Sequence, residues 1–201
     1  MSDININNLP KIIAVSKTFK IDKILPLINY GHINFGENKI QEAVDKWTEI
    51  KVKNTNIKLH MIGKLQTNKV KFAVKLFDYI HSVDNKKLAQ KIADEQKKVN
   101  KKIKIFIQVN IGDEEQKSGV KKTQVSDLIS YCKKINLDVV GLMCLPPAGD
   151  NSYLYFNEMD LLNKSFGLSE LSMGMSSDYI DATKNSSTYL RIGSAIFGKR
   201  D

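Results

Sequence analysis

Two segments at opposite ends of the chain carry residues that could act together on one ligand. Lys17 stands just beyond the apolar stretch 12–15, and Gly193 and Ser194 follow the apolar stretch 189–192. An unprotonated lysine amine attacks aldehydes, and a Gly-Ser turn lets backbone N–H groups and a hydroxyl approach a phosphate. If both stretches are strands of one barrel, the amine and the phosphate cradle share a face. This pairing is the layout of a pyridoxal phosphate site.

The size and composition of the chain favour one domain that covers residues 1–201. With 201 residues, 42% of them hydrophobic, the chain can bury one full core. Cys132 and Cys144 are its only cysteines, too few for a disulfide framework, and they suit a reducing compartment. No apolar stretch reaches the length of a membrane span, and residues 1–8 have neither a basic start nor an apolar run. We therefore expect a cytoplasmic protein with no membrane role.

The chain has a formal net charge of +9, and nucleic-acid-binding proteins also carry an excess of positive charge. Of the 31 basic residues, however, only Arg191 and Arg200 are arginine, and the lysines are scattered along helix-like segments such as 85–102 and 121–134. Scattered charge bears on non-specific binding and not on fold. We therefore expect no specific nucleic-acid partner, and the rarity of arginine draws attention to Arg191.

Short apolar stretches alternate with amphipathic stretches of helical period along the chain. The eight expected strands cover 12–15, 33–35, 58–61, 79–82, 104–109, 139–143, 168–173 and 189–192. The expected helices cover 21–29, 38–50, 68–76, 86–99, 125–135, 153–163 and 179–182. This alternation implies a parallel sheet, and eight repeats imply an α/β fold of the closed (β/α)8 barrel type. An open doubly wound sheet is the alternative, although no Gly-x-Gly-x-x-Gly motif supports its dinucleotide-binding form.

In such a barrel, the residues that do chemistry lie where strands end and the next loops begin. The segments at these ends that are rich in glycine and polar residues are 16–18, 36–38, 62–68, 110–112, 116–119, 172–176 and 193–194. The loops after the seventh and eighth strands commonly bind phosphate in barrels. We therefore expect the phosphate cradle in 172–176 and 193–194.

Seven short motifs occur in order between residues 14 and 198. They read AVSKT at 14–18, NFGEN at 34–38, HMIG at 60–63, QKSG at 116–119, GLM at 141–143, LSMGMS at 171–176 and RIGSAIFG at 191–198. Together these motifs resemble the YggS/PROSC family of pyridoxal phosphate-binding proteins, and the resemblance covers nearly the whole chain.

The resemblance implies a single-domain TIM barrel similar to the N-terminal domain of alanine racemase, a fold type III barrel that holds pyridoxal 5'-phosphate (PLP) as a Schiff base. Lys17 matches the family's Schiff-base lysine. The positions that match residues around the cofactor are Asn38, His60, Met143, Ser172, Gly174, Ser176, Arg191, Gly193 and Ser194. Of these, we expect Ser176, Gly193 and Ser194 to bind the phosphate.

The family is associated with vitamin B6 homeostasis, without an established catalytic turnover. The resemblance therefore implies a cytoplasmic monomer that holds PLP and can pass it to PLP-dependent client enzymes. Two departures from the family pattern stand out. A shortened lead-in at 1–11 replaces the helix that usually precedes the first strand, and Phe19-Lys20 replaces a frequent Lys-Pro.

The chemistry of the site favours a carrier over a catalyst. If Arg191 faces the pyridine nitrogen, its permanent charge opposes protonation there and makes the ring a weaker electron sink. The main alternative is a PLP-dependent amino-acid racemase or related lyase that uses Lys17 as its proton shuttle. A racemase also needs a second acid/base group, which alanine racemase carries on a further domain. A third interpretation is a barrel that binds a sugar phosphate or nucleotide, with Lys17 as general base.

Several candidates also have purely structural interpretations. Arg191 could pair with Glu37, and His60 could be a hydrogen-bonded histidine of the barrel interior. Met143 could be core filler, and the serines of the two turns could cap local structure. Cys144 is expected to be a buried, unreactive side chain.

Overall fold

Eight strands form the wall of the protein, and each pairs in parallel with the next until β8 closes on β1. The computed structural model describes residues 9–147, 149 and 151–198. Its strands are β1 (Lys11–Val15), β2 (Asn34–Glu37), β3 (Lys58–Met61), β4 (Tyr79–Val83), β5 (Lys104–Val109), β6 (Asp138–Cys144), β7 (Glu170–Met175) and β8 (Tyr189–Ile192). The closed barrel confirms the (β/α)8 prediction and shows that the open doubly wound alternative is wrong.

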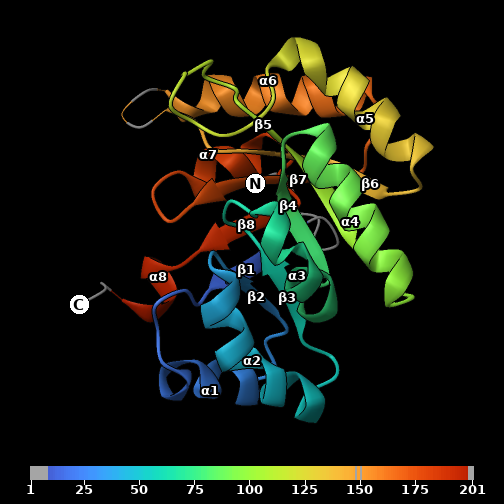
Figure 1. Cartoon of the computed structure of the whole chain (residues 1–201). Coiled ribbons are helices and arrows are strands. Elements are labelled where there is room, and N and C mark those ends of the chain that lie inside the picture. Colours follow the sequence, from blue (N-terminus) through green and yellow to red (C-terminus); the bar gives the residue numbers. More distant parts are fainter. Residues whose placement is uncertain (1–8, 148, 150, 199–201) are drawn as a thin grey trace.

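The helices surround this barrel, with α1 and α2 below it and α5 and α6 above it in the view of Figure 1. They are α1 (Ile21–Asn29), α2 (Ile40–Lys53), α3 (Val70–Leu76), α4 (Lys86–Lys98), α5 (Val125–Lys134), α6 (Ser152–Ser165), α7 (Tyr179–Lys184) and α8 (Ser194–Phe197). Two 3₁₀ turns, η2 (Thr67–Lys69) and η3 (Lys122–Gln124), lead into α3 and α5. This order places every loop between a strand and the following helix at one end of the barrel.

The strands bury both of their faces, as expected for a parallel sheet covered by helices. Outside the wall, Phe35 of β2 packs against Trp47 of α2 with their ring centroids 4.9 Å apart, and both side chains are fully buried. Inside the wall, Ile13, Phe106 and Tyr189 belong to a smaller apolar cluster. Buried polar side chains also lie in the interior, among them His60, His81 and Ser172.

Two of the differences between predicted and observed boundaries have local reasons, and one short helix was not predicted. Strand β7 begins at Glu170 and not at Leu168, because Gly167 takes a left-handed φ of +63° after α6. The Leu168 carbonyl there accepts a hydrogen bond from the Asn163 side chain. Helix α2 begins at Ile40, which leaves Asn38 in the preceding loop. Helix α8 has only four residues, too few for a periodic pattern to reveal it. Most of the predicted lead-in at 1–11 lies outside the described residues.

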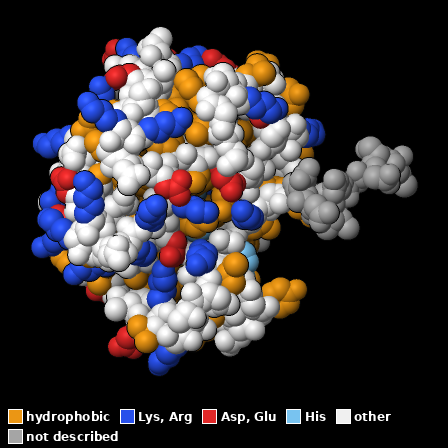
Figure 2. Space-filling view, turned by 90° about the vertical axis from the view of Figure 1, so that its right-hand side faces the viewer, with side chains coloured by type: hydrophobic (Ala, Val, Ile, Leu, Met, Phe, Trp, Pro, Cys, Tyr) orange, Lys and Arg blue, Asp and Glu red, His pale blue; other side chains and the backbone are white. Residues whose placement is uncertain are grey.

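Lysines and carboxylates are mixed on the face of the protein that Figure 2 shows. This mixing fits the scattered placement of lysines along the sequence. Within the described part of the chain, no helix is long and apolar enough to cross a membrane.

Candidate functional site

Lys17 follows the carboxyl end of β1, in a segment whose backbone is tightly held. The preceding Ser16 is fully buried, and its hydroxyl donates to Glu37 Oε1 at 2.8 Å. The following Thr18 has a φ of +69°, which is unusual for a β-branched residue. Its backbone N–H donates to the Glu42 carboxylate. Contacts on both sides of Lys17 therefore fix where its side chain leaves the backbone.

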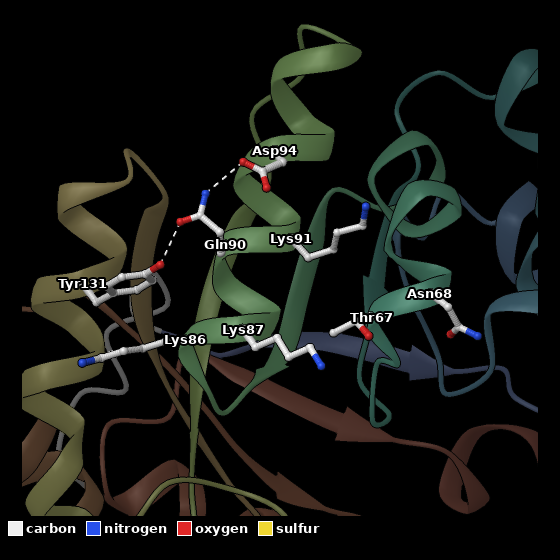
Figure 3. Close-up of a pocket in the computed structure, with 8 residues that line it drawn as sticks. All are labelled: Thr67, Asn68, Lys86, Lys87, Gln90, Lys91, Asp94 and Tyr131. Carbon is white, nitrogen blue, oxygen red and sulfur yellow. Dashed lines mark hydrogen bonds between the residues drawn. The ribbon is translucent and has the colours of Figure 1, made fainter.

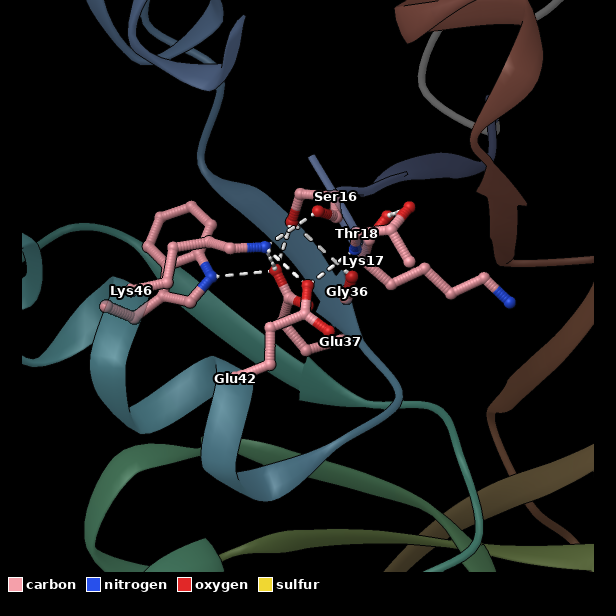
Figure 4. A network of polar contacts seen from close by, with 8 residues as sticks. Ser16, Lys17, Thr18, Gly36, Glu37, Glu42 and Lys46 are labelled. Atoms are coloured by element: carbon pink, nitrogen blue, oxygen red, sulfur yellow. Dashed lines mark hydrogen bonds and ion pairs between the residues drawn. The ribbon is translucent and has the colours of Figure 1, made fainter. Parts of the chain in front are cut away.

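A buried ion network anchors these contacts to α2. Lys46 Nζ donates to the Ser16 carbonyl at 2.9 Å and lies 3.0 Å from Glu37 Oε1 and 2.9 Å from Glu42 Oε1. The Trp47 indole N–H also donates to Glu37 Oε1, at 2.9 Å. Figure 4 shows the Lys17 side chain extending away from this network. The network therefore holds the backbone of Lys17 and leaves its amine directed elsewhere.

The ammonium group of Lys46 also lowers the pKa of its partner, the Glu42 carboxyl. Burial alone would raise the pKa of the Glu42 carboxyl, but the Lys46 ammonium and the Thr18 N–H outweigh that effect and lower the pKa. Glu42 is therefore ionised at neutral pH and accepts from both groups.

A cavity of about 490 Å³ opens at the end of the barrel beside Lys17. Its volume lies within the range of small-molecule sites. It is lined by Val15, Lys17, Asn38, Ile62, Gly63, Leu145, Met175, Ser176, Ser177, Arg191, Gly193 and Ser194. Six predicted site residues therefore line the same cavity: Lys17, Asn38, Ser176, Arg191, Gly193 and Ser194. Among the described residues of this lining, only Lys17 and Arg191 carry an amine, guanidinium, imidazole or carboxyl group.

The Arg191 guanidinium is buried at the floor of this cavity and is held by three oxygen atoms. One terminal nitrogen donates to the Ser172 carbonyl at 2.7 Å and to the Ser172 hydroxyl at 2.8 Å, and the other donates to the Cys144 carbonyl at 2.8 Å. Glu37 bonds instead to the Lys46 network, so the alternative pairing with Arg191 is wrong. Burial raises the pKa of the Cys144 thiol to about 12, which confirms an unreactive cysteine.

The other four predicted residues are not among those that line the cavity. His60 and Ser172 are fully buried in a hydrogen-bonded arrangement, and Met143 belongs to the interior apolar cluster. Gly174 has a φ of +92°, and a Cβ at this position would lie 2.5 Å from the Ala182 Cβ. Gly174 thus allows β7 to pack closely on α7. Direct contact of these four residues with a cofactor stays a prediction.

The structure adds lining residues that the sequence analysis did not single out, among them Gly63. A Cβ on Gly63 would lie 2.4 Å from the Asn38 carbonyl oxygen, so the loop after β3 presses directly on Asn38. The Asn38 Oδ1 atom is buried without a hydrogen-bond partner. An orphaned acceptor in a cavity wall fits a ligand that supplies a donor. Gly63 did lie within a recognised motif, whereas nothing marked Lys46 among the many lysines.

A second hollow, which we call the α4 groove, lies on the outside of the barrel (Figure 3). It also measures about 490 Å³ and is lined by Thr67, Asn68, Lys86, Lys87, Gln90, Lys91, Asp94 and Tyr131. The Gln90 side chain donates to Asp94 at 2.9 Å and accepts from the Tyr131 hydroxyl at 2.8 Å. None of the predicted site residues lines it.

The family model described as "Alanine racemase, N-terminal domain" matches residues 5–201. The chain belongs to this family. Among its relatives, the "Pyridoxal phosphate homeostasis protein" of Pasteurella multocida is 34% identical and aligns over 95% of this chain and 87% of its own. The protein of the same name from Aquifex aeolicus is 36% identical over 96% of this chain and 88% of its own. These relatives confirm the resemblance on which the sequence analysis relied.

Solved structures of the family have the same fold. PipY of Synechococcus elongatus PCC7942, solved with PLP bound, is 30% identical, has a TM-score of 0.87 and matches 94% of this chain and 92% of its own. PipY without PLP gives the same TM-score and identity. Alanine racemase of Clostridium difficile is 16% identical with a TM-score of 0.78, and this chain covers 54% of it, a likeness of fold alone.

Proposed function

We propose that this protein binds PLP in the cavity at the barrel mouth, holds it through the Lys17 amine and serves PLP homeostasis. The observation that carries the proposal is that Lys17, Arg191, Ser176 and Ser194 line one cavity of about 490 Å³. The name of the homeostasis relatives and the PLP-bound structure of PipY support it.

The residues present fit the groups of the cofactor. PLP supplies an aldehyde that reacts with amines and a ring that can accept electrons. Ser176, Gly193 and Ser194 lie together on the wall and are our candidates for the phosphate, which suits hydroxyl donors and a glycine backbone. Arg191 would supply a cationic donor for the ring nitrogen, and its charge would disfavour a proton there.

The same lining supports storage and delivery in preference to turnover. Racemisation needs acid/base groups on both faces of a substrate carbon. In the described lining, Lys17 is the only group of this kind besides Arg191, whose high pKa makes it a poor proton donor. We therefore propose that the protein buffers PLP and passes it to PLP-dependent client enzymes, and that it acts as a monomer. Both cysteines are buried as free thiols, which supports a reducing, cytoplasmic setting.

Absorption spectra of the purified protein with and without added PLP test this proposal. We expect a visible band and, after borohydride reduction, a stable adduct on the peptide that contains Lys17. Both should disappear in Lys17→Ala and persist in Lys87→Ala, the matched control from the α4 groove. A wild-type protein without band or adduct would contradict PLP binding and favour the phosphate-ester interpretation. Steady turnover of an amino acid that is lost in Lys17→Ala would contradict the carrier role.

A further inference from the structure

A line of hydrogen bonds crosses the barrel interior from the start of β2 to the cavity floor. Asn34 Oδ1 lies 3.1 Å from His60 Nε2, and His60 Nδ1 lies 2.9 Å from His81 Nε2. His81 Nδ1 lies 2.9 Å from the Ser172 hydroxyl, which in turn contacts Arg191 at 2.8 Å. Apart from Asn34 at its outer end, the members of this line are all less than 5% exposed. The line therefore links five strands to one guanidinium.

The guanidinium determines the direction of every bond in this line. Arginine has only donors, so the Ser172 oxygen accepts from Arg191. His81 Nδ1 is the other polar atom that this hydroxyl contacts, so the arrangement that uses the hydroxyl proton directs it to His81 Nδ1. A neutral imidazole has one donor and one acceptor. His81 therefore carries its proton on Nε2 and donates to His60 Nδ1, and His60 donates from its own Nε2 to Asn34 Oδ1. All four bonds run one way, away from Arg191.

Stacking on aromatic neighbours holds the two imidazole rings in the orientations in which these hydrogen bonds form. His60 stacks on Tyr79 with centroids 4.3 Å apart and an interplanar angle of 11°, and His81 stacks on Phe106 at 4.2 Å and 16°. Burial is the main cause that lowers the pKa of both rings, that of His60 to about 3. A second proton on either ring would also set two donors against each other. Both histidines are therefore neutral at physiological pH.

We propose that Asn34, His60, His81 and Ser172 are positioning residues for Arg191, a one-directional hydrogen-bond chain that fixes how the guanidinium is presented to the cavity. The effect on PLP rests on the proposed function, whereas the direction of the chain does not. The chain reaches Arg191 from below through Ser172, while the Cys144 carbonyl holds the other terminal nitrogen. Without the Ser172 hydroxyl, Arg191 would keep only the backbone carbonyls of Ser172 and Cys144, and no side chain in the described part of the chain would constrain its guanidinium.

The direction of the chain can be measured in cofactor-free protein. The sequence has only three histidines, so spectra of ¹⁵N-histidine-labelled protein are simple to assign. His32 lies off the chain, with its Nε2 atom 2.9 Å from the Asn34 carbonyl, and serves as the internal reference. We expect His60 and His81 to be neutral at pH 7 with the proton on Nε2. A proton on Nδ1 of either ring, or a charged ring, would overturn the proposal.

A substitution of Ser172 should change the tautomer of His60, which lies two members further along the hydrogen-bond chain. Ser172→Ala removes the donor to His81, and we expect His60, which does not contact Ser172, to become a mixture of tautomers. Ser172→Thr keeps the hydroxyl and should restore the single tautomer. If His60 is identical in Ser172→Ala and wild type, the chain does not transmit direction and the proposal is overturned.

The effect of the hydrogen-bond chain on the cofactor can be measured as the absorption spectrum and the retention of bound PLP. His81→Phe keeps a planar ring against Phe106 but breaks the chain; we expect a shifted absorption band and about tenfold faster loss of PLP on dialysis. His32→Phe, off the chain, should match wild type. Should His81→Phe fail to fold, the Ser172→Ala and Ser172→Thr pair provides the same comparison. A broken chain with an unchanged spectrum and retention would overturn the positioning role. Absence of PLP binding by wild type would contradict the proposed function alone, because the tautomers are measured without it.

Discussion

The barrel-mouth cavity and the α4 groove have the same volume, about 490 Å³, but they are built differently. Five of the eight residues that line the groove come from one helix, α4, and project from its surface. The mouth collects residues from the ends of six strands, and buried contacts hold them from behind. The volume therefore does not distinguish the two hollows, whereas the buried contacts behind the lining do.

The largest expected difference between the two regions follows from breaking the ion network behind Lys17. Lys46→Met leaves the buried Glu37 carboxylate without its cation, and we expect the free energy of unfolding to fall by about 3–5 kcal/mol. PLP retention should fall as well, because Ser16 loses its anchor. Urea unfolding followed by circular dichroism measures the first effect. Lys87→Met in the α4 groove is the control, with an expected change within about 0.5 kcal/mol. Equal losses in the two variants would refute the comparison.

The interior below the mouth should also make stability depend on pH. Burial holds the pKa of His60 near 3, against 6.5 for an ordinary histidine, so the unfolded chain binds more protons between these values. The contribution to stability is complete above pH 6.5 and is lost as pH falls toward 3, at up to about 1.4 kcal/mol per pH unit for one ring.

Unfolding midpoints at pH 7 and pH 5 test this dependence. We expect His60 alone to account for a loss of about 2 kcal/mol across this interval, and His81 to act in the same direction. His60→Gln should flatten the dependence, and His32→Gln should leave more of it in place. A His60→Gln protein with the wild-type dependence would show that the interior ring does not cause it.

The smallest expected effect is a loss of PLP retention on substitution of Gly193, the predicted phosphate-binding glycine of the barrel mouth. Gly193→Val adds a side chain where the backbone is expected to approach the phosphate, and we expect about tenfold weaker PLP retention, equivalent to ~1.4 kcal/mol, in a folded barrel. Lys87→Ala in the α4 groove should retain PLP as wild type does. Absorbance after dialysis measures retention, and circular dichroism confirms folding. Unchanged retention in Gly193→Val would remove Gly193 from the cradle.

The barrel could be predicted because its elements are encoded locally. The buried part of β5 contains the apolar run 105–107, and an amphipathic helix such as α4 has apolar residues at a 3.6-residue period. The six predicted residues that line the cavity all follow strands or end them, so topology alone brought them to the same end of the barrel. The family motifs then distinguished Lys17 from the other lysines.

The support behind the site could not be predicted, because it depends on contacts between distant segments. The bond from Lys46 to Ser16 joins residues 30 apart, and the bond from His81 to Ser172 joins residues 91 apart. No local pattern distinguishes Lys46 or His81 from a solvated side chain. Likewise, the left-handed φ of Thr18 contradicts the preference of its own residue type and arises from the contacts of its backbone with Glu42.

The hydrogen bonds of Arg191 have an electrostatic consequence for how ligands arrive. Its terminal nitrogens donate to two carbonyls and a hydroxyl, all uncharged, so the bonds solvate the guanidinium without neutralising it. From the barrel interior it is contacted by Ser172 and, through Ser172, by His81, which are both neutral and supply no counter-charge. The field of the cation is therefore focused outward through the mouth, where it attracts anions over a distance that shortens as salt is added. We therefore expect the barrel mouth to attract anions, phosphate esters among them, more strongly at low salt than at high salt.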